Sequence, residues 1–200
     1  MKIIVLGGFL GSGKTTALLS LARFLVNRCE KRENAVMILE NEIGEVGVDD
    51  KTVAAAGLNV TNLFAGCVCC TASGELTVAA QRILREYDPE WLIIETTGIA
   101  YPREIRANLG SALGLEPRIL VIADAVRWKR LYRAMNVLLA GQLESADAVL
   151  LNKCDAASPD AVAGAEAQIG TLNGAIPLFR VSAADGIADE VWETATGCGL

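Results

Sequence analysis

The chain has 200 residues, of which 52% are hydrophobic and 5% aromatic, with a formal net charge of −6 and no histidine. This length suits one globular domain with a core of mostly aliphatic side chains. The negative charge argues against nucleic acid or an anionic membrane as a main partner. No run of about 18 apolar residues is present to cross a membrane, and we expect a cytoplasmic protein.

Strand and helix patterns alternate along the chain. Short apolar runs predict buried strands, and stretches with helical periodicity lie between them. Such strands indicate a largely parallel sheet covered on both faces, which is an α/β fold that binds ligands at the carboxyl ends of its strands. Strands are expected at 2–6, 35–39, 91–95, 118–124, 147–152 and 177–182, with a weaker one at 58–63, and helices at 15–28, 74–87, 103–113, 126–143, 159–172 and 187–195.

A phosphate-binding motif follows the first expected strand. Residues 8–15, "GFLGSGKT", fit the P-loop pattern G-x-x-x-x-G-K-[ST] between a strand and a helix. The glycines let backbone N–H groups point at phosphate oxygens, the lysine can reach the β- and γ-phosphates, and a threonine hydroxyl can bind Mg²⁺. The alternative is an ordinary glycine-rich turn. The residues assigned to nucleotide phosphates are Gly8, Gly11, Ser12, Gly13, Lys14, Thr15 and Thr16, with Lys14 also catalytic and Thr15 the magnesium ligand.

Three cysteines lie within the segment "GCVCC" at 66–70. Thiolates bind soft metal ions such as Zn²⁺, Co²⁺ or Ni²⁺, and the outer two cysteines have the C-x-x-C spacing of a chelating loop. With no histidine, a fourth ligand must be water or a carboxylate of the acidic loop expected at 40–52. A redox dithiol and small apolar packing are the alternatives. The expected ligands are Cys67, Cys69 and Cys70, with Glu40, Glu42, Glu45 or water as the fourth.

The remaining cysteines, Cys29, Cys154 and Cys198, are isolated in the sequence. Free cysteine behaves as a small apolar residue when it is buried. We therefore expect these three side chains to be ordinary core or surface thiols.

The strand expected at 91–95 ends in the motif "ETTG". Glu95 is the acidic side chain expected opposite the P-loop, near Mg²⁺ or the attacking water, and we predict that it is catalytic. Gly98 can turn its N–H toward the γ-phosphate, so the segment 97–102 is expected to respond to the third phosphate. The alternative is a strand that ends in a helix cap formed by one of the two threonines.

The motif "NKCD" at 152–155 ends a later strand and predicts which base is bound. Its aspartate can accept two hydrogen bonds from guanine, whereas adenine would leave this carboxylate buried and unpaired. Its asparagine can tie the loops together, and the stem of its lysine can lie across the ring. The segment "VSA" at 181–183 adds a backbone N–H toward guanine O6, and the alternative for "NKCD" is a polar loop. The residues assigned to the base are Asn152, Lys153, Asp155, Ser182 and Ala183.

Taken in order, "GGFLGSGKTT", "ENEIGEVGVDD", "GCVCCT", "ETTG" and "NKCD" resemble the nucleotide-binding domain of the CobW-like GTPases, which are relatives of UreG and HypB. The likeness covers about residues 2–183. It implies a P-loop NTPase fold of three layers, a mostly parallel sheet flanked by helices. It also implies hydrolysis of GTP to GDP with Mg²⁺, delivery of zinc, cobalt or nickel to a target protein, a metal-dependent homodimer and a link to cobalamin biosynthesis.

The chain departs from this family at its carboxyl end. Family members usually carry a second domain, often rich in histidine, whereas this sequence stops at Leu200 without one. We therefore expect a single GTP-binding domain over 1–200. The rival functions are a GTP-dependent regulator or binding module with no metal role, and a P-loop small-molecule kinase, although no arginine-rich lid segment is evident.

Hydrolysis is expected to be slow. Ile99 follows "ETTG", so the glutamine that orients water in Ras-like GTPases is missing from that place. No arginine is obviously placed as a finger in cis, and the nearest candidates, just beyond this segment, are Arg103 and Arg106.

Overall fold

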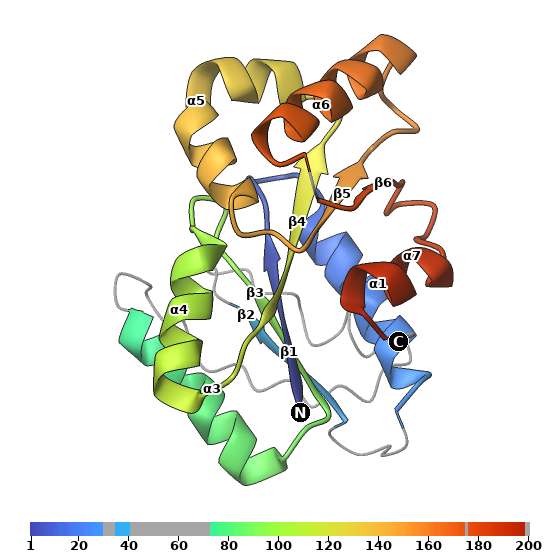
Figure 1. The fold of residues 1–200 in the computed structure, drawn as a ribbon. Coiled ribbons are helices and arrows are strands. Elements are labelled where there is room, and N and C mark those ends of the chain that lie inside the picture. The colour runs from blue at the N-terminus through green and yellow to red at the C-terminus, as the bar shows by residue number, and fades with distance from the viewer. Residues whose placement is uncertain (30–34, 41–72, 175, 199–200) are drawn as a thin grey trace.

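Six parallel strands form one sheet, in the order β2-β3-β1-β4-β5-β6, in a computed structural model of the chain (Figure 1). The structure describes residues 1–29, 35–40, 73–174 and 176–198, and this sheet lies within those ranges. The strands are β1 (Lys2–Gly7), β2 (Val36–Glu40), β3 (Trp91–Glu95), β4 (Arg118–Asp124), β5 (Ala148–Asn152) and β6 (Leu178–Arg180).

Helices cover both faces of the sheet. In the described ranges α1 and α7 pack on one face, while α3, α4, α5 and α6 pack on the other (Figure 1). This is the three-layer arrangement predicted from the alternation of strands and helices, and the fold class is confirmed. The helices are α1 (Lys14–Val26), α3 (Ser73–Tyr87), α4 (Pro102–Leu113), α5 (Trp128–Leu143), α6 (Pro159–Leu172) and α7 (Asp189–Thr196).

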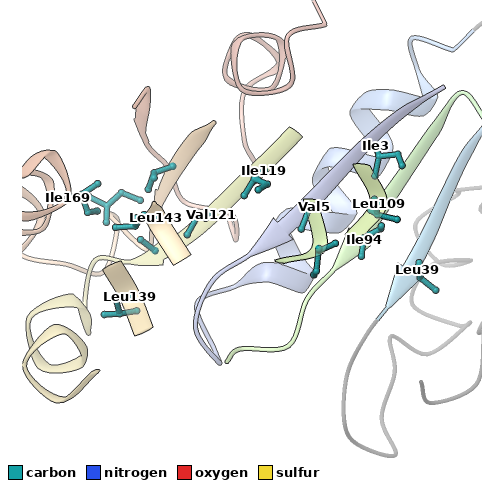
Figure 2. Packing of buried hydrophobic residues seen from close by; sticks show 14 of the residues in the cluster. Ile3, Val5, Leu39, Ile94, Leu109, Ile119, Val121, Leu139, Leu143 and Ile169 are labelled. Atoms are coloured by element: carbon teal, nitrogen blue, oxygen red, sulfur yellow. The ribbon is translucent and has the colours of Figure 1, made fainter. Parts of the chain in front are cut away.

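The central strand shows why the sheet strands read as continuous apolar runs. Ile3 and Val5 of β1 pack into the core beneath α3 to α6, and Ile4 and Leu6 pack into the core beneath α1 and α7. Figure 2 shows the first of these cores, with residues of the strands facing those of the helices. Fully burying each such side chain contributes about 1.5–3 kcal/mol to stability.

The strand order reverses at β1. This strand lies between β3 and β4, so the chain passes from one side of β1 to the other between them. Ligands of open parallel sheets bind at such a reversal of strand order, outside the carboxyl ends of the strands. The segments that follow β1, β3, β4 and β5 therefore meet at one place.

Among the element predictions that differ from the structure in their detail are the last strand and the helix predicted at 126–143. The last strand ends at Arg180, two residues before the predicted end, because the chain then turns and the Ala183 N–H donates to a side chain rather than to a strand. The helix α5 begins at Trp128 and is interrupted at Met135, whose φ of −142° and ψ of 38° are not helical. The weaker strand predicted at 58–63 lies outside the described residues.

Among the helices of the described residues, none combines the length and apolar character that a membrane crossing requires.

Candidate nucleotide-binding site

The P-loop lies between β1 and α1, with its backbone against the ends of two other strands. Gly8, Gly11 and Gly13 have φ values of 134°, 72° and 97°, which glycine tolerates without steric cost. A Cβ on Gly8 would lie 2.3 Å from the Ile122 carbonyl oxygen, and one on Gly13 would lie 2.3 Å from Asn152 Nδ2. The glycines at these positions are therefore required by close packing as well as by backbone conformation.

A threonine and a glutamate meet beside the P-loop. Thr15 Oγ1 donates a hydrogen bond of 3.3 Å to Glu95 Oε1, and Glu95 is the last residue of β3 and 2% exposed. This places the carboxylate opposite the P-loop, where the sequence predicts it. A hydroxyl and a carboxylate oxygen are the ligand types that Mg²⁺ prefers, so this pair fits the ion. Lys14 is 4% exposed, whereas Thr15 and Thr16 are exposed.

The buried hydroxyl of Ser12 adds a polar group inside the loop. Ser12 is 1% exposed, and among the described residues its Oγ has no hydrogen-bond partner. Buried polar atoms of folded proteins nearly always have a partner. This atom is consistent with a site whose polar groups are arranged for a ligand.

The segment after β3 touches the P-loop directly. A Cβ on Gly98 would lie 2.6 Å from the Leu10 backbone nitrogen, so the "ETTG" glycine packs against the loop. The buried side chain of Gln142, on α5, donates to the carbonyls of Gly98 and Ala100 at 3.1 Å each. Sequence reasoning missed Gln142, because nothing in its local pattern separates it from other polar residues of an amphipathic helix.

The alternative role of the two threonines as helix caps is wrong. Thr96 donates its hydroxyl to the Leu6 carbonyl at 3.1 Å, within the sheet. The helix that follows begins at Pro102, with Tyr101 at the N-cap and no capping hydrogen bond from a side chain. Proline at the first position of a helix has no backbone N–H, so no capping hydrogen bond is needed there.

Asn152 joins the P-loop to the segment after β6. Its Nδ2 donates to the Ser12 carbonyl, and its Oδ1 accepts from the Ala183 N–H, both at 2.8 Å. The predicted tie between loops is thus present. Of the segment "VSA", which was predicted to direct a backbone N–H toward guanine O6, the Ala183 N–H is donated to Asn152 in this structure, and the Ser182 Oγ is buried without a hydrogen-bond partner among the described residues.

The last residue of "NKCD", Asp155, is exposed in this structure. The burial of its carboxylate against a bound base stays a prediction. The loop leaves β5 at its end and turns outward, with Lys153 at a φ of 63°.

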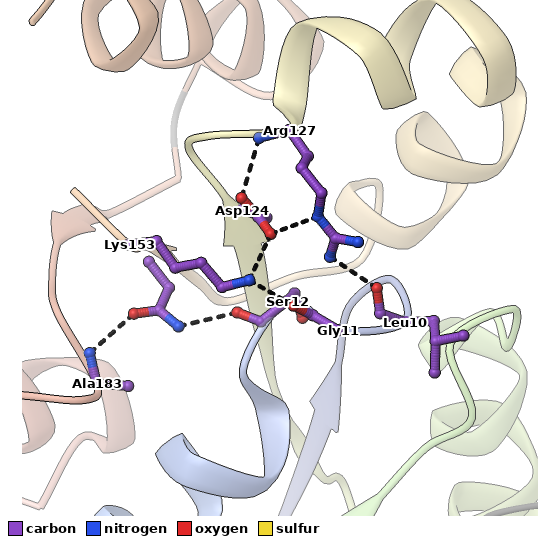
Figure 3. A network of polar contacts seen from close by, with 8 residues as sticks. Leu10, Gly11, Ser12, Asp124, Arg127, Lys153 and Ala183 are labelled. Carbon is purple, nitrogen blue, oxygen red and sulfur yellow. Dashed lines mark hydrogen bonds and ion pairs between the residues drawn. The ribbon is translucent and has the colours of Figure 1, made fainter. Parts of the chain in front are cut away.

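A buried aspartate at the end of β4 connects these loops, and sequence reasoning missed it (Figure 3). Asp124 is 2% exposed and accepts hydrogen bonds from Lys153 Nζ and from Arg127 Nε, both at 2.7 Å. Burial alone would raise the pKa of Asp124, but the hydrogen bonds from Lys153 and Arg127 outweigh it and hold the pKa below its ordinary value. The sequence feature that could have identified Asp124 is its position: it is an acidic residue that ends the apolar run 118–124, at the same edge of the sheet as the other motifs.

The two arginines proposed from sequence as finger candidates point elsewhere. Arg103 pairs with Glu144 at 2.5 Å, and Arg106 pairs with Asp147 and donates to the Pro117 carbonyl. The arginine that contacts the P-loop is Arg127, whose Nη2 donates to the Leu10 carbonyl at 2.8 Å. Distance along the chain, which singled out Arg103 and Arg106, thus did not indicate which arginine lies close to the P-loop in space.

The predicted metal ligands Cys67, Cys69, Cys70, Glu42 and Glu45 lie outside the described residues. Glu40 is the last residue of β2, and its Cα is the register partner of Glu95 in β3. The acidic loop expected at 40–52 therefore begins beside the carboxyl end of β3. Within the residues that the structure describes, no group of three or more cysteine, aspartate or glutamate side chains is arranged to hold a metal ion.

The isolated cysteines are partly buried thiols, as predicted. Cys29 and Cys198 pack against the core beneath α1 and α7, and Cys154 packs against the opposite core. Burial, followed by the nearby Glu90 carboxylate, raises the pKa of the Cys29 thiol to about 11. Burial also raises the pKa of Cys154. Both thiols are therefore protonated at neutral pH.

A parallel sheet with a P-loop after its central strand, an acidic residue beside it and a buried asparagine joining the loops defines a P-loop nucleotide-binding α/β protein. The family model for the CobW/HypB/UreG nucleotide-binding domain matches residues 2–180, and the chain belongs to this family.

Known relatives are similar along most of the chain. The zinc chaperone YeiR of Escherichia coli (strain K12) is 35% identical over 158 residues, which cover 76% of this chain and 46% of YeiR. The zinc chaperone YjiA of the same organism is 31% identical over 195 residues, covering 92% of this chain and 58% of YjiA. The crystal structure of the Zn(II)-bound YjiA GTPase superimposes with a TM-score of 0.66 at 26% identity and covers all of this chain and 63% of that one. The chain thus spans about half the length of these two relatives.

Proposed function

We propose that this chain binds GTP, hydrolyses it slowly to GDP and couples the nucleotide state to the handling of zinc for a target protein. The observation that supports it most strongly is the pair of hydrogen bonds made by Asn152. They bring the P-loop, "NKCD" and "VSA" around one site. A phosphate-binding loop and a guanine-reading motif at the same site favour a GTPase over an adenine-dependent kinase.

Each part of the hydrolysis is assigned to residues at this site. Lys14 and the backbone N–H groups of the P-loop hold the β- and γ-phosphates. Thr15 and Glu95 hold Mg²⁺, which neutralises charge on the phosphate oxygens when it is bound. We also assign to Glu95 the orientation of the attacking water. Gly98, packed against Leu10, carries the segment that responds to the γ-phosphate.

We expect slow turnover in the isolated chain. The pairing of Arg103 and Arg106 with carboxylates away from the P-loop leaves neither free to serve as a finger. A missing arginine finger costs about 10³–10⁵ in rate, so the expected turnover is about 10⁻²–10⁻⁴ s⁻¹. A single-turnover assay with radiolabelled GTP at several protein concentrations measures it. Fast hydrolysis by dilute, metal-free protein would contradict this expectation.

The zinc role rests on the three clustered cysteines and on the relatives named as zinc chaperones. The proposed cargo site is Cys67, Cys69 and Cys70, with a carboxylate of the 40–52 loop or water as the fourth ligand. Because this loop begins beside Glu95, an ordering of the loop by the γ-phosphate would change the supply of that carboxylate. GTP would then favour bound metal, and hydrolysis would favour its release to the target protein.

The test is a titration of Zn²⁺ and Co²⁺ into reduced protein with a GTP analogue, with GDP and without nucleotide. Thiolate–metal absorbance of Co²⁺ reports the site, and coupling must be reciprocal: zinc must tighten GTP-analogue binding by the factor by which the analogue tightens zinc binding. The Cys67→Ser/Cys70→Ser variant should lose the absorbance, and Cys198→Ser is the matched control. Equal metal affinity in all three nucleotide states would contradict the coupling. Absence of thiolate–metal absorbance would favour a GTP-dependent regulator without a metal role.

The same samples test the homodimer that UreG and HypB relatives suggest. Sedimentation velocity with and without zinc measures the mass of the species. A zinc-dependent dimer that disappears in the double cysteine variant would place the cysteine segment at the interface. An unchanged monomer would remove dimerisation from the proposal.

A further inference from the structure

Three successive carbonyls of the P-loop each accept a hydrogen bond from a different side chain (Figure 3). The Leu10 carbonyl accepts from Arg127 Nη2 at 2.8 Å, the Gly11 carbonyl from Lys153 Nζ at 2.6 Å, and the Ser12 carbonyl from Asn152 Nδ2 at 2.8 Å. Lys153 and Asn152 belong to "NKCD". Arg127, from the turn between β4 and α5, belongs to no motif of the sequence.

Holding these carbonyls fixes the orientation of the loop. The C=O and N–H of a planar trans peptide point in opposite directions. A side chain that holds the Leu10 carbonyl therefore sets the direction of the Gly11 N–H, on the opposite side of the same peptide. The loop contains three glycines with positive φ, and glycine restricts the backbone little. Contacts with side chains from other segments must therefore hold the loop in one conformation.

Arg127 is itself held in place. Asp124 Oδ1 accepts from the Arg127 backbone N–H at 3.0 Å, and Asp124 Oδ2 accepts from Arg127 Nε at 2.7 Å. The Asp124 side chain is 1% exposed, whereas that of Arg127 is 30% exposed. The guanidinium thus connects the buried Asp124 carboxylate to the Leu10 carbonyl of the P-loop. It also packs closely on the loop, because a Cβ on Gly11 would lie 3.0 Å from Arg127 Nη2.

We propose that Arg127, oriented by Asp124, is a positioning residue for phosphate binding. It holds the Leu10–Gly11 peptide so that the N–H of this peptide faces the phosphates. Asp124 also accepts from Lys153 at 2.7 Å, so one buried carboxylate sets both the Arg127 contact and the Lys153 contact. The inference rests on the proposed binding of guanine nucleotide at this site and adds a residue that acts on the phosphates alone.

If Arg127 acts only on the phosphates and "NKCD" acts on the base, loss of Arg127 should affect only ligands that carry phosphates. Loss of Arg127 should weaken GDP and GTP-analogue binding about 10- to 150-fold, the range expected for one hydrogen bond involving a charged group. Guanosine has no phosphate, so its affinity should not change. The preference for GDP over ADP should also remain, because the base contacts come from "NKCD".

The experiment measures dissociation constants of GDP, a GTP analogue, guanosine and ADP for the unmodified chain and four variants. Arg127→Ala should show the phosphate-specific loss, and Arg127→Lys should recover part of it, since an ammonium can hold only one of the two partners well. Arg130→Ala, which changes an exposed arginine in the first turn of α5, is the matched control and should bind like the unmodified chain. Asp124→Asn should weaken GDP more than Arg127→Ala does, because it also releases Lys153.

Each outcome decides between the proposals. GDP binding by Arg127→Ala equal to that of the unmodified chain would overturn this inference and leave the proposed function standing. An equal loss of GDP and guanosine, with no recovery in Arg127→Lys, would also overturn it, because it would mean a general loss of folded structure. An unmodified chain that binds no guanine nucleotide would overturn both the inference and the proposed function.

Discussion

Thr15 and Glu95 stand 80 residues apart in the sequence, and the hydroxyl of one donates to the carboxylate of the other at 3.3 Å. The contact exists because β1, which leads into the P-loop, and β3, which ends in Glu95, are adjacent parallel strands with Leu6 opposite Glu95. The carboxyl ends of such strands meet at one edge of the sheet. An oxygen pair of this kind is suited to a hard divalent cation.

Removal of the Thr15 hydroxyl should raise the magnesium concentration that GTP hydrolysis requires. We expect Thr15→Ala to raise the Mg²⁺ concentration for half-maximal GTP hydrolysis about tenfold or more, since one of few protein oxygens near the ion is lost. The assay is hydrolysis rate against Mg²⁺ concentration. Thr171→Ala, which changes an exposed threonine of α6, is the control. Identical magnesium curves for Thr15→Ala and the unmodified chain would remove Thr15 from the ion site.

Asp155 should determine the choice of base. Guanine donates to a carboxylate from N1–H and the 2-amino group, and adenine offers neither donor. In Asp155→Asn one acceptor becomes a donor, so the ratio of ADP to GDP dissociation constants should fall at least tenfold. Calorimetric titration with both nucleotides measures the ratio. Asp160→Asn, an exposed aspartate at the start of α6, should leave it unchanged. Similar affinities of the unmodified chain for ADP and GDP would contradict guanine recognition.

The place of each motif in the fold could be predicted from sequence, because a motif is defined by the order and spacing of neighbouring residues. A P-loop is defined by spacing within eight positions between a strand and a helix, and its position after β1 is confirmed. The Arg127–Leu10 contact could not be predicted in that way, because 117 residues separate the two. It requires that β4 lie next to β1, and hydrophobic patterns indicate that strands exist without indicating their order.

The details of the base site that the motifs did not indicate have the same origin. The exposure of Asp155 depends on how the loop leaves β5. The direction of the Ala183 N–H depends on the side chain of Asn152, which lies 31 residues away. Motifs thus identified the residues at the site, and the hydrogen bonds among them required the fold.

Asp124 should make stability depend on pH in acid. Its pKa is held below the ordinary value by Lys153 and Arg127, against the opposing effect of burial. A depressed folded-state pKa stabilises the protein fully above the unfolded-state pKa of about 4, and this stabilisation is lost as pH falls through the folded-state value. We therefore expect Asp124→Asn to be less stable than the unmodified chain by about 1–3 kcal/mol at pH 7.

The difference should narrow as the pH falls below about 4, where the native carboxyl also loses its charge. Urea unfolding of both proteins between neutral and acid pH measures it, without nucleotide. Asp160→Asn is again the exposed control. A difference that stayed constant down to the lowest pH at which the chain folds would mean that the Asp124 charge contributes nothing to stability.

The last prediction concerns the segment that follows "ETTG". Gln142 is 1% exposed, and its amide donates to the carbonyls of both Gly98 and Ala100. Gly98 packs against the Leu10 backbone, so this buried amide holds the segment against the P-loop. A segment that responds to the third phosphate must be held in a position from which it can reach it.

We expect Gln142→Leu, which keeps the side-chain volume but removes both donors, to weaken binding of a GTP analogue about 5- to 50-fold. GDP binding should change by less than twofold, because GDP has no γ-phosphate for the segment to contact. Calorimetric titration with both nucleotides measures the two effects, and the melting temperature without nucleotide reports any general loss of stability. Gln168→Leu, which removes an amide that accepts from Trp128 between α5 and α6, is the control and should leave both affinities unchanged. Equal weakening of GDP and the GTP analogue in Gln142→Leu would show that the segment does not distinguish the two nucleotides, and the sensing role of Gly98 would then have to be abandoned.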